Sequence, residues 1–212
     1  PTGGGEKIRT LVADYYNRKY GSSYVMDNVI INVGASEALS SCLRTILNSG
    51  DEVIIPAPFY PGYPSMVNLC YAKSIFMDTT KTDFKITSKL LEENYSDKTK
   101  AILLSNPCNP TGNVLTLEEM EIIADFVEKR DIFLIADEIY SELSFYNFYS
   151  FSSFEKIKDK VIIINGFSKS HSMTGWRIGY TIFPLEYRRY FLNTTLYTLS
   201  SPMALSIAAA EI

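Results

Sequence analysis

The sequence predicts an α/β fold with a mostly parallel central sheet, and two observations support this prediction. Short apolar runs recur along the 212 residues, and such runs are typical of strands that are buried on both faces. Turns and helix-like segments separate these runs, an alternation that is typical of α/β domains. The runs cover residues 29–31, 53–55, 74–77, 101–104, 132–135, 161–164 and 178–182.

The first predicted element is a helix over residues 6–20. Ile8, Leu11, Val12 and Tyr15 fall on one stripe at helical spacing, and Gly21 is a typical stop signal. We therefore expect this stripe to face the core.

Two further helices are predicted over residues 36–48 and 117–129. Thr116 is a favourable N-cap for the second of them, and acidic residues in its first turn complement the helix dipole. Residues 147–160 are predicted to form a surface connection, whose aromatic side chains pack locally. These aromatics are Phe148, Tyr149, Phe151 and Phe154.

Composition and charge exclude several classes of protein. The net charge is 20 − 24 = −4, so no general attraction to nucleic acid or to anionic membranes is expected. No apolar run approaches the ~20 residues of a membrane span, and the first residues lack the layout of a signal peptide. Three widely spaced cysteines and a single histidine, His171, predict neither a zinc site nor a disulfide framework. We expect a cytoplasmic protein with reduced cysteines.

Candidate functional residues lie just after the apolar runs. In open α/β sheets, ligands bind in the crevice beyond the carboxyl ends of the strands. Gly34, Ala35 and Ser36 follow the first run and open a helix, which suits a phosphate, although a plain turn capped by Ser36 is the alternative. Asp137 ends the fifth run, where poor solvation calls for a cationic partner, or it caps a helix.

Lys169 follows the sixth run between small residues, and Arg177 comes eight positions later. A lysine packed against the end of a sheet loses hydration, which favours its neutral, nucleophilic amine. Such an amine can form a Schiff base with an aldehyde cofactor. An arginine offers a planar fork suited to phosphate, with an ordinary salt bridge as the alternative. Together, the two residues suggest pyridoxal 5′-phosphate (PLP).

Four ordered segments of this chain resemble the motifs of one family. The segments are 34–36, 106–112, 137–140 and 166–179. The last of them is similar to the active-site signature of the class I/II aminotransferases, PLP enzymes of fold type I. The resemblance implies the large domain of that fold, with three α/β/α layers around the mostly parallel sheet.

The resemblance also implies a role for each candidate residue. The phosphate would be bound by Gly34, Ala35, Ser36 and Arg177, and the ring would stack on Tyr60, with Phe59 or Tyr63 as core aromatics. Asn109 and Tyr140 would donate hydrogen bonds to the phenolic oxygen of the cofactor, and Asp137 would keep the ring nitrogen protonated. Lys169 would form the Schiff base and then shuttle the substrate's proton. Structural roles in a turn for Asn109 and in the core for Tyr140 are the alternatives.

One position departs from the family pattern. Many members carry serine three positions before the lysine, where this chain has Gly166. Ser168 is the candidate to replace that hydroxyl at the phosphate. Glu138 is expected to face structure or solvent, and His171 to be structural or to lie at the rim.

The resemblance sets expectations for the whole protein. Residues 1–212 would form the PLP-binding large domain, without the N-terminal segment and the C-terminal small domain of the family. The implied activity is ping-pong transfer of an amino group from an amino acid to a 2-oxo acid, by a C₂ homodimer. Alternatives are a carbon–sulfur β-lyase or a cyclopropane-forming synthase of the same fold, or an effector-sensing domain of a transcription regulator.

Overall fold

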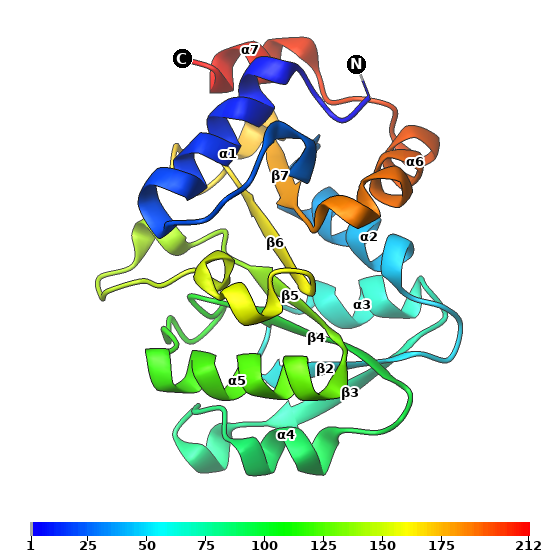
Figure 1. Ribbon diagram of the computed structural model, residues 1–212, viewed down its shortest axis with the longest axis vertical. Helices are drawn as coiled ribbons and strands as arrows, with labels where there is room; N and C mark the ends of the chain where they lie inside the picture. The colour runs from blue at the N-terminus through cyan, green and yellow to red at the C-terminus, as the bar shows by residue number, and fades with distance from the viewer. Residues whose placement is uncertain (1) are drawn as a thin grey trace.

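A seven-stranded sheet organises the protein, in the order β1-β7-β6-β5-β4-β2-β3 (Figure 1). The computed structural model describes residues 2–212. β7 runs antiparallel to both of its neighbours, and every other neighbouring pair is parallel. The mostly parallel sheet is therefore confirmed. Its strands are β1 (Val29–Asn32), β2 (Glu52–Ala57), β3 (Lys73–Asp78), β4 (Thr99–Ser105), β5 (Phe133–Asp137), β6 (Val161–Gly166) and β7 (Gly179–Ile182).

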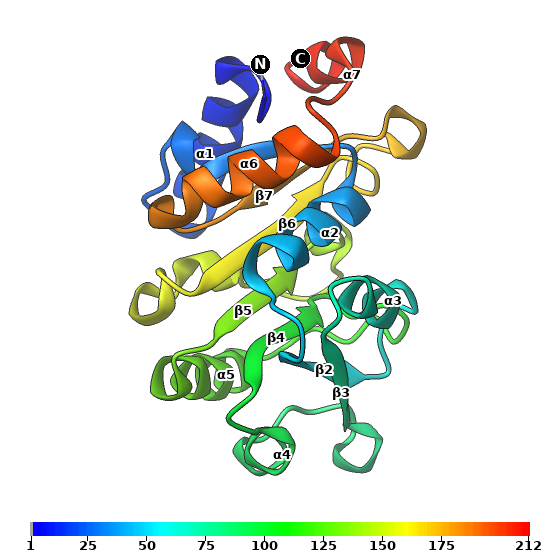
Figure 2. The ribbon, with the colours of Figure 1, turned by 90° about the vertical axis from the view of Figure 1, so that its right-hand side faces the viewer.

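Helices cover both faces of the sheet and give the three layers (Figures 1 and 2). One buried cluster joins the sheet to α1, α4 and α5, and a second joins its other face to α2, α3 and α6. The helices are α1 (Glu6–Tyr20), α2 (Ala35–Ile46), α3 (Gly62–Asn68), α4 (Ser88–Asn94), α5 (Leu117–Arg130), α6 (Arg188–Thr198) and α7 (Ala204–Ala210). α7 lies beside α1, where Lys7 and Glu211 form an ion pair of 3.4 Å. Within residues 2–212, no helix combines the length and the apolarity that crossing a bilayer requires.

Local signals set the helix ends as predicted. Gly21 ends α1 in the left-handed conformation, with a φ of 71° that glycine adopts at little cost. Thr116 caps α5 in a reciprocal arrangement: its hydroxyl accepts from the Glu119 amide at 3.2 Å, and the Glu119 carboxylate accepts from the Thr116 amide at 3.0 Å.

The predicted core stripe of α1 is confirmed except at Leu11. Ile8 and Val12 are buried and Tyr15 packs against the same core cluster, but Leu11 is 40% exposed, and Ala13 and Tyr16 are also buried. The helix is rotated because Tyr16 packs edge-to-face against Tyr180 of β7, with ring centroids 6.2 Å apart. A stripe read from spacing alone does not show which large aromatic the sheet accommodates.

Two other expectations are corrected. β3 lies at the sheet edge and is not buried on both faces, since Phe76 is 53% exposed and stacks on Phe59. Residues 147–160 are more than a surface connection, because Phe151 and Ile157 are fully buried in the α1–α5 side of the core. The buried aromatic side chains of this segment therefore pack in the same core cluster as residues of α1 and α5.

The sheet topology brings distant segments to one edge. β2, β4, β5 and β6 are mutually parallel, and β1 is parallel to β6 because both are antiparallel to β7. The carboxyl ends of these five strands therefore lie at the same edge, where the crevice of an open sheet forms.

Candidate active site

A cavity of about 230 Å³ opens at this carboxyl edge. Nine of the ten predicted site residues line it, which confirms that the segments converge. Gly34 lies directly behind the lining, because a Cβ placed on it would come within 2.5 Å of Arg177 Nη2. The nine are Ala35, Ser36, Tyr60, Asn109, Asp137, Tyr140, Ser168, Lys169 and Arg177.

One end of the cavity is built for an anion. α2 begins at Ala35, and Gly34 precedes it with a φ of 80°, a conformation that favours glycine. The exposed Arg177 guanidinium lies against this turn, where Nη1 donates to the Thr174 carbonyl at 2.9 Å and Nη2 donates to the Val33 carbonyl at 3.5 Å. A helix N-terminus and a guanidinium with remaining donors are suited to a phosphate.

Asp137 provides a negative charge at the cavity wall. Its side chain is buried, one oxygen accepts from the Tyr63 hydroxyl at 2.8 Å, and the other accepts from the Ile139 amide at 3.2 Å. Burial raises the pKa of this carboxyl to about 6. Among residues 2–212, no cationic side chain pairs with it. A cationic ring nitrogen would supply the partner that this buried carboxylate lacks.

Aromatic and amide side chains complete the walls. Tyr60 meets Tyr63 edge-to-face at 5.4 Å, while Phe59 turns away to stack on Phe76. Asn109 and Tyr140 are half-buried and line the same cavity. The Lys169 amine lies 5.6 Å from the centroid of the Tyr140 ring.

The lysine itself differs from expectation. Lys169 lines the cavity but its side chain is exposed, so the prediction of an amine packed against the sheet is wrong for this chain. The lysine lies in the turn that follows β6, and in this turn the Ser168 carbonyl accepts a hydrogen bond from the Thr174 hydroxyl at 3.0 Å. Ser168 is buried and borders the cavity.

Backbone contact explains why glycine occupies position 166. A Cβ on Gly166 would come within 2.8 Å of the Gly179 Cα on β7 and 3.0 Å of the Ile178 carbonyl oxygen. Gly179 in turn faces the start of α2, where its Cβ would come within 2.7 Å of the Ala35 nitrogen. A serine at position 166 does not fit this arrangement of backbones.

The comparisons with known proteins decide the family. The model of the family described as aminotransferase class I and II matches residues 1–212. The chain belongs to the class I and II aminotransferases. Members of this family are generally PLP-dependent, and the anion end, the unpaired carboxylate and the lysine of the cavity fit that cofactor.

Relatives in this aminotransferase family match nearly the whole chain. It is 42% identical over 212 residues to a probable N-acetyl-LL-diaminopimelate aminotransferase of Bacillus subtilis (strain 168), covering 99% of this chain and 53% of the relative. It is 37% identical to an aspartate aminotransferase of Bacillus sp. (strain YM-2), covering 99% and 55%. The chain thus spans about half the length of the curated relatives it matches.

Solved aminotransferase structures share the fold. A double mutant of Thermus thermophilus aspartate aminotransferase superposes with a TM-score of 0.95 at 30% identity, covering 100% of this chain and 56% of that one. An aromatic aminotransferase from Pyrococcus horikoshii OT3 gives a TM-score of 0.95 at 31% identity, covering 100% and 58%.

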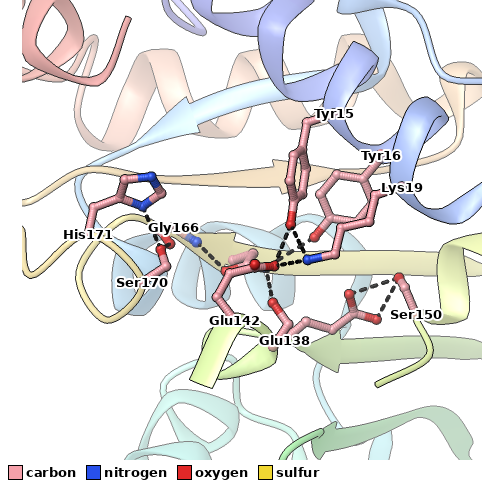
Figure 3. Close-up of polar contacts among 11 residues, drawn as sticks. Tyr15, Tyr16, Lys19, Glu138, Glu142, Ser150, Gly166, Ser170 and His171 are labelled. Atoms are coloured by element: carbon pink, nitrogen blue, oxygen red, sulfur yellow. Dashed lines mark hydrogen bonds and ion pairs between the residues drawn. The ribbon is translucent and has the colours of Figure 1, made fainter. Parts of the chain in front are cut away.

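Side chains next to the aminotransferase motifs support the site from outside the cavity (Figure 3). Glu138 is fully buried, and its Oε1 and Oε2 accept from the Ser150 hydroxyl at 2.9 and 2.8 Å. Its side chain therefore has a structural environment, as expected. His171 is exposed, lies within hydrogen-bond distance of the Ser170 hydroxyl and packs on Phe167, which places it at the rim.

The turn after Tyr140 is tied to α1. The Glu142 carboxylate accepts from the Tyr15 hydroxyl and the Lys19 amine, both on α1 (Figure 3). One outer helix therefore helps to hold the loop that carries Tyr140.

Sequence reasoning missed five residues that line the same cavity: the apolar Leu39 and Ile139, and the polar Tyr63, Ser105 and Thr174. Tyr63 was expected only as a possible core aromatic, and its hydroxyl partner lies 74 positions away. The spacing of Thr174, three residues before Arg177, was an available signal, because short turns bring such pairs together. No local pattern could have indicated the Tyr63–Asp137 contact.

Proposed function

We propose that this protein is a PLP-dependent aminotransferase that transfers an amino group from an amino acid to a 2-oxo acid. The observation that supports it best is one cavity combining an anion end, a buried carboxylate without a cationic partner, and a lysine. When bound, the cofactor supplies an aldehyde that condenses with amines and a ring that withdraws electrons.

Each residue of the cavity has a separate proposed role in binding the cofactor. The N-terminus of α2 and Arg177 hold the phosphate, and Tyr60 covers one face of the ring. Asp137 stabilises the proton on the ring nitrogen, because a buried carboxylate attracts a cation strongly. Asn109 and Tyr140 donate hydrogen bonds to the phenolic oxygen.

Lys169 is the proposed catalytic base. Its Nζ would hold the cofactor covalently through the aldehyde carbon and, once displaced by the substrate's amine, would be free to move a proton between the substrate's α-carbon and that aldehyde-derived carbon. Ser168 is proposed to take the place of the serine that position 166 cannot carry, since it borders the cavity one residue before the lysine.

The wider organisation is part of the proposal. Residues 1–212 form the large, cofactor-binding domain, and the active enzyme is a cytoplasmic homodimer. The half-length match to relatives supports a domain assignment, because the matched part of the chain carries a cavity that nine of the predicted site residues line.

Borohydride mapping tests the assignment of the lysine. The full protein is loaded with PLP, reduced and digested, and we expect the label on Lys169 alone. Lys169→Ala should carry no fixed cofactor while retaining noncovalent binding, and the exposed Lys98→Ala should label normally. A label on another side chain, or its persistence in Lys169→Ala, would refute the proposal.

A substrate screen tests the reaction. Amino acids are offered with 2-oxoglutarate, and keto-acid-dependent transfer is measured beside release of pyruvate and ammonia. Transfer supports the aminotransferase, whereas release without transfer identifies a lyase.

A further inference from the structure

Tyr63 on α3 makes the one side-chain hydrogen bond to Asp137 among residues 2–212. Its hydroxyl donates to Asp137 Oδ2 at 2.8 Å, and both side chains are buried, with Tyr63 at 1% exposure. We propose that Tyr63 is a positioning residue: its hydroxyl fixes the orientation and the charge of the Asp137 carboxylate toward the cavity. The role that we assign to Tyr63 rests on the proposed function, whereas the hydrogen bond between Tyr63 and Asp137 does not depend on it.

The geometry fixes the carboxylate from two sides. Oδ2 accepts from Tyr63, and Oδ1 accepts from the backbone amide of Ile139, which follows β5. Each oxygen keeps a further lone-pair site, since a carboxylate offers about four. Two donors from different elements therefore hold the plane of the group, while acceptor capacity remains for a partner in the cavity.

The ring of Tyr63 is itself immobile. It belongs to the buried cluster on the α2–α3 side of the sheet and contacts Tyr60 edge-to-face at 5.4 Å. A hydroxyl on a ring packed in this way can turn about its C–O bond but cannot leave its position. Tyr63 thus contacts both Asp137 and Tyr60, the residue that is proposed to cover the cofactor ring.

The contact also controls charge. Burial raises the pKa of Asp137, and the hydrogen bond from Tyr63 opposes this rise by stabilising the ionised form. The other charged or titratable groups around the cavity are Tyr60, Tyr140, Lys169 and Arg177, and Glu138 adjoins Asp137 at the end of the strand. These groups stay in place when only the Tyr63 hydroxyl is removed.

The experiment titrates Asp137 without cofactor. The full protein is labelled with ¹³C at aspartate carboxyls, and the Asp137 signal is assigned by its loss in Asp137→Asn. In Tyr63→Phe we expect the titration midpoint to move upward by about one pH unit, because a hydrogen bond to a charged group is lost. Thr195→Val, which also removes a fully buried hydroxyl but on α6 and outside the cavity lining, is the matched control and should leave the midpoint unchanged.

Cofactor binding gives a second readout. A midpoint that moves from about 6 to about 7 lowers the charged fraction at pH 7 from about nine-tenths to about one-half. The noncovalent affinity for PLP, measured in the Lys169→Ala background, should therefore fall about twofold at pH 7 and recover above pH 8. A merely structural role would lower the affinity equally at every pH.

A third variant covers the case in which Tyr63→Phe does not fold. Replacing Tyr63 by 3-fluorotyrosine keeps the shape and makes the phenol a stronger donor, so the Asp137 midpoint should move downward. An unchanged midpoint in both variants would overturn the proposal. Because this titration needs no PLP, that result is distinguishable from failure of the borohydride mapping.

Discussion

Burial of the ionisable Glu138 destabilises the folded protein as the pH rises, and we expect the isosteric change Glu138→Gln to remove this effect. Its carboxyl is fully buried, and burial raises its pKa from 4.5 to about 8, while the Ser150 hydroxyl and the Phe151 amide oppose the rise. Because the folded protein holds this proton more tightly than the unfolded chain does, the stabilisation is complete below pH 4.5. It is lost as the pH rises through the interval to about 8.

The size of the effect follows from this interval. Each pH unit between the two pKa values costs about 1.4 kcal/mol. Integrating the titration from pH 5.5 to pH 7.5 gives a loss of about 2.5 kcal/mol in the free energy of unfolding. Glu138→Gln removes the titration and keeps the shape, and its amide can still hydrogen-bond to Ser150 and accept from the Phe151 amide. The variant should gain about 2.5 kcal/mol relative to the native protein between those pH values.

Urea unfolding at pH 5.5, 6.5 and 7.5 measures the difference between variant and native protein. Taking the difference cancels Asp137, whose pKa is also raised, because both proteins contain it. Glu142→Gln is the control. Ion pairing with Lys19 and the Tyr15 hydrogen bond lower the pKa of Glu142, so its contribution is constant across this range. A difference for Glu138→Gln that stays flat from pH 5.5 to 7.5 would refute the reasoning.

Two further predictions concern packing and capping. Gly166→Ser should lower the free energy of unfolding by ~1–3 kcal/mol, because its Cβ meets the Gly179 backbone, which cannot move aside cheaply. Thermal unfolding checks it against Gly175→Ser, where a Cβ meets nothing within 4 Å, and equal stability of the two variants would contradict the packing argument. Thr116→Ala should cost about 1 kcal/mol by removing the reciprocal cap of α5. Urea unfolding beside Thr10→Ala, an exposed threonine within α1, tests this, and a loss no larger than the control's would show that the cap contributes little.

Much of the fold was predictable because its signals are local. Seven apolar runs correspond to the seven strands, and for all of them except the partly exposed β3 the reason is that strands covered on both faces require uninterrupted apolar sequence. The antiparallel direction of β7 was not predictable, because it depends on the path of the chain between 167 and 178 and leaves no pattern in the strand. The rotation of α1 toward Tyr16 depends on Tyr180, a partner 164 positions away that spacing cannot reveal.

In the candidate site, too, the features with local sequence signals were predictable and those that depend on distant residues were not. Nine of its lining residues were predictable because they lie in segments that follow apolar runs and so reach the same edge of the sheet. The exposure of Lys169 was not, because hydration depends on what the turn leaves uncovered and not on the residues that flank the lysine. Tyr63 was missed because its significance depends on the position of one oxygen atom, on a helix that sequence analysis had not assigned.

The close approach of Gly166, Gly179 and Gly34 has a consequence for the range of molecules that the cavity can accept. Main chains touch between the lysine turn, β7 and the start of α2, and no side chain lies between them that could adopt another rotamer. The backbone positions from which the Lys169 and Arg177 side chains project are therefore held at a set separation. A ligand whose anionic group and carbonyl lie much farther apart has to be accommodated by the two exposed side chains, because the main chain between them has no room to move.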